Sequence, residues 1–172
     1  MSSAAGTEES SPSLELTVIA NQHKTDVAAR YRARAMKHIE TETAFEPARL
    51  LAVLDAGTAP AVAAEGLRWT ISADPWLPSR IVADERKLQV MLSSLIECSL
   101  RGADQGTIAL DATPVFDGRQ LWIRFTLTNP GGAALSGAAR HLARQLHGFV
   151  EVETDATGEA RFVFVAPVSL VE

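Results

Sequence analysis

The sequence predicts one α+β domain, a two-layer sandwich in which helices cover one face of a mixed sheet of about five strands. Three observations lead to this prediction. The expected elements alternate as helix, strand, helix, hairpin, helix, hairpin. Their apolar residues recur with helical or strand periodicity. The 172 residues fit one domain, and 47% of them are hydrophobic, which is enough for an ordinary core.

Two segments precede this domain, which we expect to span residues 44–172. Residues 1–13 are mostly small or polar, so we expect a disordered tail. Residues 14–43 should form a helix or linker for dimerisation or docking. LELTVIA (14–20) fits either a short strand or the start of a helix. The helix expected from residue 26 to 40 is amphipathic or simply solvated, and its apolar stripe is Val27, Tyr31, Ala35 and Ile39.

The first element of the domain is a helix within FEPARLLAVLDAG (45–57). Pro47 lies near its expected start and Gly57 at its expected end, the positions that these residue types favour. PAVAAEG (60–66) is either a second short helical piece or a continuation of the first. GLRWTISA (66–73) alternates apolar and polar residues, which indicates a strand.

The central helix is predicted within residues 84–102. Asp84 can cap its start and Gly102 can end it. The helix is apolar nearly all round, so we expect it to be buried on more than one side. Its main stripe, with Met91 and Cys98 beside it, consists of Leu88, Leu92, Leu95, Ile96 and Ser99.

The rest of the chain predicts two hairpins separated by a helix. Strands within 106–115 and 119–128 are joined at Asp117-Gly118, a strong hairpin signal. A helix follows within SGAARHLARQLHG and is expected to end at Gly148. A second hairpin, FVEVET and ARFVFVA, closes the domain. We expect the three tryptophans to pack in the core or at its edge rather than stack on bases; they are Trp69, Trp76 and Trp122.

Composition excludes several classes of function. The net charge of −5 argues against a general nucleic-acid binder. A single cysteine excludes an internal disulfide framework and a multi-cysteine metal site. The sequence has no apolar run long enough to insert in a membrane and no secretory signal at its N-terminus, so we expect a cytoplasmic protein. No catalytic triad can be placed, and no cofactor is expected.

Several stretches in order resemble the catalytic and ATP-binding domain of sensor histidine kinases, which has the GHKL fold, over about residues 45–168. FEPARLL is similar to the opening segment of that family. LPSRIVADERKLQVMLSSLIECSL is similar to its signature of proline, strand, Asp and a helix carrying N-L-x-x-N-A. LWIRFTLTNPGG lies where the family has a strand running into D-x-G-x-G. RHLARQLHGFVEVETDATGEARFVFVAP is similar to the closing helix and last hairpin.

The resemblance implies that the Mg²⁺ ligand of the family is replaced. In the family the second Asn of the helix motif holds the Mg²⁺ that bridges the ATP phosphates. Aligning SSLIECS on that motif places Ser94 on the first Asn and Cys98 on the second. Mg²⁺ needs hard oxygen ligands, and a thiol is a soft one. Glu97 and Arg101 match acidic and basic residues common in the family.

The adenine and phosphate sites are also altered, by the same resemblance. Asn129 replaces the Asp of D-x-G-x-G and is followed by Pro130 and Gly131, and Pro130 removes a backbone donor. The long lid that encloses the phosphates is missing, because the next helix is expected to start near Ser136. The resemblance therefore implies a vestigial pocket that does not bind Mg-ATP, lined by Glu97, Cys98, Arg101, Asn129 and Gly131.

A complete kinase also needs a helical hairpin with a phosphoacceptor histidine, and residues 14–43 supply one helix at most. His23 and His38 are the candidate acceptors, and we expect ordinary surface histidines at both positions. The sequence thus predicts a non-catalytic regulatory or adaptor module of two-component-type signalling. Its expected partner is a receiver domain or a histidine kinase, with a homodimer through residues 14–43.

Two alternatives remain open at this point. The first is a sensor of a nucleotide or cyclic dinucleotide that uses the vacated pocket, with phosphate contacts from Arg80, Arg101 and Arg124. The second is an atypical histidine kinase or phosphotransferase domain with residual ATP binding.

Overall fold

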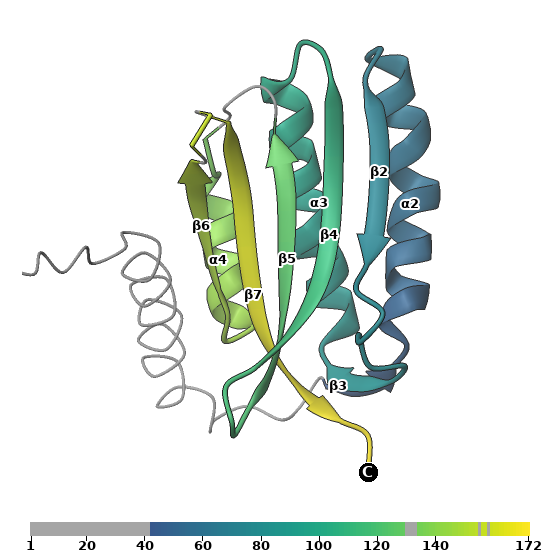
Figure 1. Ribbon diagram of the computed structural model, residues 1–172, viewed down its shortest axis with the longest axis vertical. Helices are drawn as coiled ribbons and strands as arrows, with labels where there is room; N and C mark the ends of the chain where they lie inside the picture. The colour runs from purple at the N-terminus through teal and green to yellow at the C-terminus, as the bar shows by residue number, and fades with distance from the viewer. Residues whose placement is uncertain (1–41, 130–133, 155, 158) are drawn as a thin grey trace, which may run out of the picture.

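A computed structural model describes residues 42–129, 134–154, 156–157 and 159–172. These residues form three helices and one mixed sheet of seven strands (Figure 1). The helices are α2 (Pro47–Ala64), α3 (Glu85–Gly102) and α4 (Gly137–Gln145). The strands are β1 (Thr43–Phe45), β2 (Arg68–Ala73), β3 (Ile81–Ala83), β4 (Thr107–Phe116), β5 (Leu121–Asn129), β6 (Phe149–Thr154) and β7 (Ala160–Leu170).

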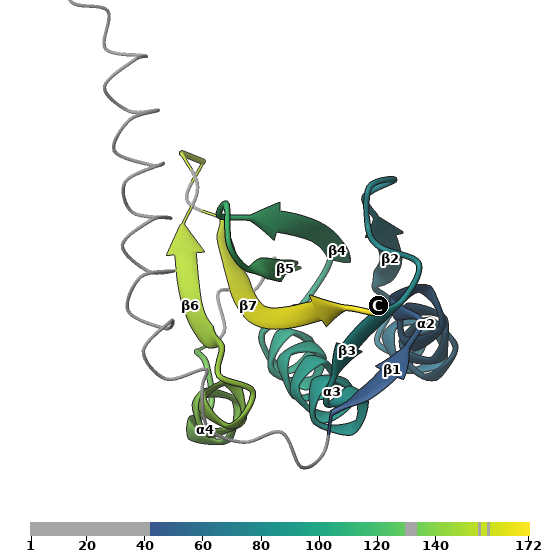
Figure 2. The same cartoon turned by 90° about the horizontal axis from the view of Figure 1, so that it is seen from below.

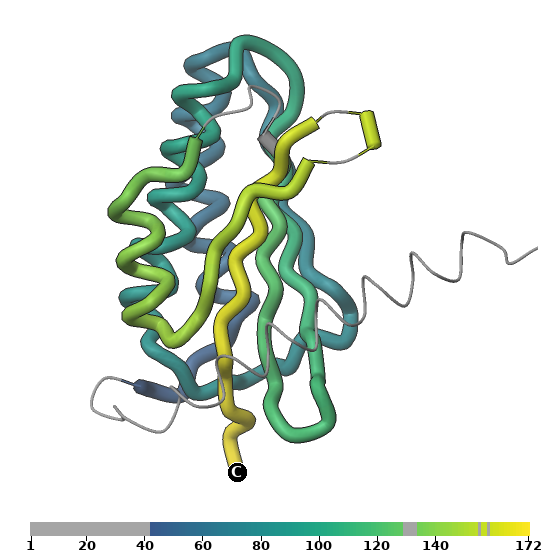
Figure 3. The backbone as a smooth tube through the Cα atoms, turned by 90° about the vertical axis from the view of Figure 1, so that its left-hand side faces the viewer, coloured from purple at the N-terminus to yellow at the C-terminus, as the bar shows by residue number. Residues whose placement is uncertain are grey.

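The long strand β7 organises the sheet. The strand order is β1-β3-β7-β5-β4-β2, and β6 pairs with β7 as well. Strand β6 pairs with the first half of β7, from Ala160 to Val165. Strand β3 pairs with the other end of β7, at Ser169 and Leu170. Among the hydrogen-bonded strand pairs of the described ranges, only β2 and β4 are parallel. All three helices cover the same face of the sheet (Figures 2 and 3). The predicted α+β two-layer sandwich is therefore confirmed.

The sheet has two more strands than the sequence predicted. The five expected strands are β2 and β4 to β7, and the additional ones are β1 and β3, of which only β3 was implied, by the resemblance of residues 77–100 to the family signature. Each of these has only three residues, too few to show a two-residue periodicity. They pair with each other and extend the sheet along the end of β7.

The core lies between the sheet and the helices. The predicted stripe of α3 is buried, including Met91 and Cys98, as expected for a helix covered on several sides. From the sheet, Phe125 of β5 and Phe164 of β7 stack with ring centroids 5.8 Å apart. Such aromatic pairs add to the stabilisation from apolar burial. Layers packed in this way hold the ends of α3 and α4 in fixed positions relative to β7.

Of the two interpretations of PAVAAEG, continuation of the first helix is confirmed. The expected end at Gly57 is wrong, because the helix continues through Gly57 and Pro60 to Ala64. Burial of Val62 against the core stabilises the last turn despite the proline. The helix ends at Gly66 instead, where φ is +73°. The amides of Gly66 and Leu67 donate to the carbonyls of Ala63 and Val62, a Schellman motif.

The predicted start of α3 and the predicted β4–β5 turn are both confirmed. An oxygen of Asp84 accepts a hydrogen bond from the Lys87 amide at 3.0 Å, as an N-cap residue does. In the turn, Asp117 Oδ1 accepts from the amides of Arg119 and Gln120, and Gly118 has φ of +91°.

Helix α4 ends differently from the prediction. The residue with a left-handed conformation is His147, with φ of +55°, and not Gly148. The Gly148 amide donates to the carbonyl of Ala143 at 2.9 Å. Gly148 is required for another reason, since a Cβ there would collide with the carbonyl oxygen of Val165 in β7. The glycine therefore serves close packing of the helix end on the sheet.

The tryptophans differ in their surroundings. Trp122 is buried and donates to Asp117 Oδ2, and Trp69 is half-buried and donates to Asp55. Trp76 is 85% exposed, so the expectation of core or edge packing is wrong for it. None of the helices in the described ranges is long and apolar enough to cross a membrane.

Candidate functional site

The residues matched to the family's Mg²⁺-binding motif lie in the second half of α3. Cys98 is 2% exposed and belongs to the hydrophobic core. The Arg101 guanidinium donates through Nη2 to Cys98 Sγ at 3.4 Å, from one helical turn further on. The thiol is thus enclosed and already accepts a hydrogen bond from a cation. A buried sulfur in this position offers no oxygen to a divalent metal ion.

Glu97 is exposed and contributes to a different surface from Cys98. Its side chain lines a groove of about 250 Å³ between α2 and α3, of which Cys98 is not a lining residue. The other walls of that groove include Val53, Gly57 and Ser93. The structure therefore brings Arg101 to Cys98 and places Glu97 on the side of α3 that faces α2.

Asn129 is the last residue of β5, and its backbone pairs with Ala160 of β7. Gly131 lies outside the described residues, as do His23 and His38 and most of the proposed docking segment 14–43. Six residues separate Asn129 from Ser136, which caps α4. The connection between β5 and α4 is therefore short.

One backbone amide at the start of α4 is hydrogen-bonded by the capping residue Ser136. The Ser136 hydroxyl accepts a hydrogen bond from the Ala139 amide at 3.1 Å. Free amides at a helix start are what bind phosphate in nucleotide sites. One such donor, the Ala139 amide, is therefore already occupied at the start of α4.

The arginines proposed for phosphate contacts are not gathered at one place. Arg124 alternates along β5 with the core residues Ile123 and Phe125, so it lies on the sheet face away from the helices. Its Nη2 forms an ion pair with Glu153 of β6 at 3.2 Å. Since Cys98 lies in the helical layer, Arg124 and Arg101 cannot contact one ligand in that pocket.

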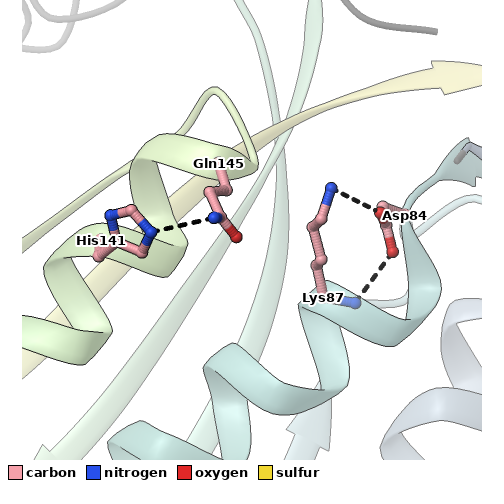
Figure 4. Close-up of polar contacts among 4 residues, drawn as sticks. All are labelled: Asp84, Lys87, His141 and Gln145. Atoms are coloured by element: carbon pink, nitrogen blue, oxygen red, sulfur yellow. Dashed lines mark hydrogen bonds and ion pairs between the residues drawn. The ribbon is translucent and has the colours of Figure 1, made fainter. Parts of the chain in front are cut away.

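A larger pocket, of about 540 Å³, lies between the first turn of α3 and the last turn of α4. It is at the opposite end of α3 from Cys98, beside Ala83 of β3 and Ala166 and Pro167 of β7. Figure 1 shows β3 next to this end of α3. Its apolar base includes Leu88, Leu146 and Ala166. His141 and Gln145 of α4 face Lys87 and Asp84 of α3 across it (Figure 4).

Sequence reasoning missed this pocket. From the sequence alone, His141 and His147 are expected at surface or helix-cap positions. Only the fold brings both of them to one pocket with Lys87. The signal in the sequence was the composition of residues 137–147, which contain four basic or histidine residues and no acidic one. Within the described ranges, no group of three His, Cys, Asp or Glu residues could hold a metal ion.

Comparison with known proteins places this fold in a class. No family model and no curated protein sequence matches the chain. Solved structures do match, and they show that the chain has the fold of histidine kinase catalytic domains, α+β with a mixed sheet and three helices.

The nucleotide-free catalytic domain of the histidine kinase ThkA matches with a TM-score of 0.60 and 14% identity, over 74% of this chain and 96% of that domain. Full-length ShkA in complex with AMPPNP gives a TM-score of 0.65 and 19% identity over 98% of this chain, which spans 41% of ShkA. ThkA in complex with the response regulator TrrA matches with a TM-score of 0.59 and 12% identity, over 95% of this chain and 53% of the ThkA chain. At sequence identities this low, the structural similarity establishes the fold alone.

Proposed function

We propose that this chain is a non-catalytic regulatory or adaptor module of two-component-type signalling, which uses the histidine kinase fold for protein contacts and does not bind Mg-ATP. The observation that carries the proposal is the buried thiol of Cys98, bonded to Arg101, at the position matched to the Mg²⁺ ligand. A cytoplasmic location belongs to the same proposal.

The connection from β5 to α4 supports the same conclusion. A triphosphate carries several negative charges, which must be met by donors and shielded from water. Six residues between Asn129 and Ser136 are too few to form a lid of the kind that encloses such a group, and the start of α4 is capped by Ser136. The replaced metal ligand and the short connection are independent features, and both oppose nucleotide binding.

A receiver domain or a histidine kinase is the partner that we propose. ThkA, whose fold this chain shares, has been solved in complex with the response regulator TrrA. A fold that already forms such contacts can retain them after nucleotide chemistry is lost, because fold and chemistry are separable. We further propose that residues 14–43 provide dimerisation or docking.

Thermal unfolding in the presence of nucleotides tests this function. We expect no change in melting temperature with Mg-ATP, Mg-ADP or cyclic dinucleotides. A ligand that binds only the folded state, present at about 100 times its Kd, would stabilise by about 2.7 kcal/mol and raise the melting temperature by roughly 5–10 °C.

Each positive result in that panel has a different meaning. A rise with Mg-ATP that disappears without Mg²⁺ would contradict the proposal and favour residual kinase-type binding. A rise with a cyclic dinucleotide alone would favour the sensor alternative. Arg101→Gln is a suitable variant to locate such binding, because Arg101 is the cation beside Cys98.

A further inference from the structure

The pocket between α3 and α4 combines an apolar base with a charged rim. Leu88, Leu146 and Ala166 of the base are each buried. The rim side chains from α4, which include His141 and Arg144, are exposed. The hollow has a volume of about 540 Å³. An apolar base of this size with a few polar groups around it has the chemistry of a binding site.

The charge on the α4 side of this pocket is positive. Helix α4 carries Arg140, His141 and Arg144 and no acidic residue, in a chain of net charge −5. His141 and Arg144 line the pocket, and Arg140 lies one helical turn before Arg144, outside the lining. No salt bridge joins Arg140 or Arg144 to another residue in the part of the chain that the structure describes. Among those residues, none neutralises the two cations through an ion pair.

The α3 side of the pocket contributes little net charge. Asp84 caps α3 through the Lys87 amide, and its Oδ2 lies 3.1 Å from Lys87 Nζ. This pair is largely compensated within itself. Glu42 is the remaining acidic residue of the lining, next to the start of β1. Lys87 and Arg144 of the lining are thus matched in number by Asp84 and Glu42, and the positive excess beside the pocket comes from Arg140, one helical turn before Arg144 on α4.

The backbone at this rim is also unusual. His147 adopts φ of +55°, and its side chain lines the pocket. Glycine is the common residue in that conformation at a helix end. A non-glycine residue there is disfavoured unless other interactions compensate, and such positions cluster at binding sites. Gly148 beside it allows the end of α4 to pack closely on β7.

We propose that this α3–α4 pocket is the surface through which the chain binds an acidic segment of a partner protein, with a large apolar side chain of that segment seated on the base. The inference rests on the proposed function and specifies its contact surface. Carboxylates of the segment would lie along Arg140 and Arg144. Arginine is favoured at such interfaces because its guanidinium pairs with carboxylates in a bidentate manner.

A designed peptide provides a probe of stated chemistry. The peptide is a helix of roughly five turns with leucine along one stripe and glutamate elsewhere, and its twin has lysine in place of glutamate. Both are titrated into the full-length protein and followed by amide NMR shifts. We expect the glutamate peptide to shift signals at Leu88 and at residues 144–147, and the lysine twin to leave them unchanged.

Charge reversal on the rim supplies the matched comparison. Arg144→Glu is expected to weaken binding of the glutamate peptide by about tenfold or more, since like charges then face each other. Arg119→Glu carries the same change in net charge on the exposed β4–β5 turn and should leave affinity unchanged. Unchanged NMR spectra elsewhere confirm that each variant is folded.

Four results would overturn the inference. One is a shift pattern confined to the α2–α3 groove around Val53 and Ser93. Another is equal binding of the two peptides, which indicates unspecific apolar contact. A gain in affinity of about tenfold on deleting residues 1–40 would make that segment the occupant, and shifts that grow with protein concentration alone would make it a second copy. Mg-ATP binding would contradict the proposed function without changing any of these readouts.

Discussion

Replacing Phe164 by alanine is expected to lower the free energy of unfolding by about 3–5 kcal/mol. The ring is fully buried on β7 and stacks on Phe125 of β5, so the variant loses apolar burial and leaves a cavity between the sheet and the helices. Such a loss is a large share of the stability of an ordinary domain, which is about 5–15 kcal/mol. Chemical denaturation of both proteins measures it.

Phe116→Ala is the matched control for this change. Phe116 is 69% exposed at the end of β4. The same truncation there should alter the free energy of unfolding by only about 0.5 kcal/mol or less, as is usual for surface substitutions. A similar loss of stability in the two variants would contradict the burial described above, in which Phe164 lies in the core and Phe116 is exposed to solvent.

Gly148→Ala is expected to destabilise the domain by about 1–3 kcal/mol. The added Cβ would meet the Val165 carbonyl oxygen, which belongs to the backbone of β7 and cannot move without disturbing its pairing with β6. A Phe164 ring carbon lies 3.1 Å from the same Cβ position. The end of α4 must therefore shift, and thermal or urea unfolding should report the loss.

The same substitution at Gly57 should have the opposite sign. Gly57 lies inside α2 with no atom within 4 Å of an added Cβ. Alanine should therefore stabilise the helix by about 0.5–1 kcal/mol. Destabilisation at Gly57 would mean that α2 ends there after all. A neutral Gly148→Ala variant would mean that α4 does not pack on β7 as described.

Features determined by neighbouring residues could be predicted from the sequence. Asp84 caps α3 through an amide three residues away, and Asp117 forms the β4–β5 turn with amides two and three residues away. The buried stripe of α3 follows from helical periodicity alone. Each of these predictions needed only local chemistry, and each was confirmed.

Features determined by distant residues could not be predicted. Gly57 and Pro60 favour a helix end, but burial of Val62 on the sheet keeps the helix intact beyond them. Gly148 marks the end of α4 because Val165, far along the chain, approaches it. Strand β1 pairs with β3, which in turn pairs with the end of β7; three residues show no periodicity, and only the resemblance to the family signature implied β3.

The candidate site divides in the same way. Cys98 and Arg101 are one helical turn apart, so their proximity follows from the sequence, and the structure shows the hydrogen bond. Glu97 is adjacent in sequence and yet faces α2, because successive helical residues point in different directions. The α3–α4 pocket joins residues from α3, α4 and β7, and the whole fold is needed to assemble it.

Isothermal titration of the full-length protein with Mg-ATP tests most directly the proposal that this chain has the histidine kinase fold and does not bind Mg-ATP. We predict no magnesium-dependent heat of binding. We predict the same for Cys98→Asn, because restoring one oxygen ligand supplies neither the lid nor the phosphate donors. Stoichiometric, magnesium-dependent binding of ATP by the unmodified protein would contradict the account.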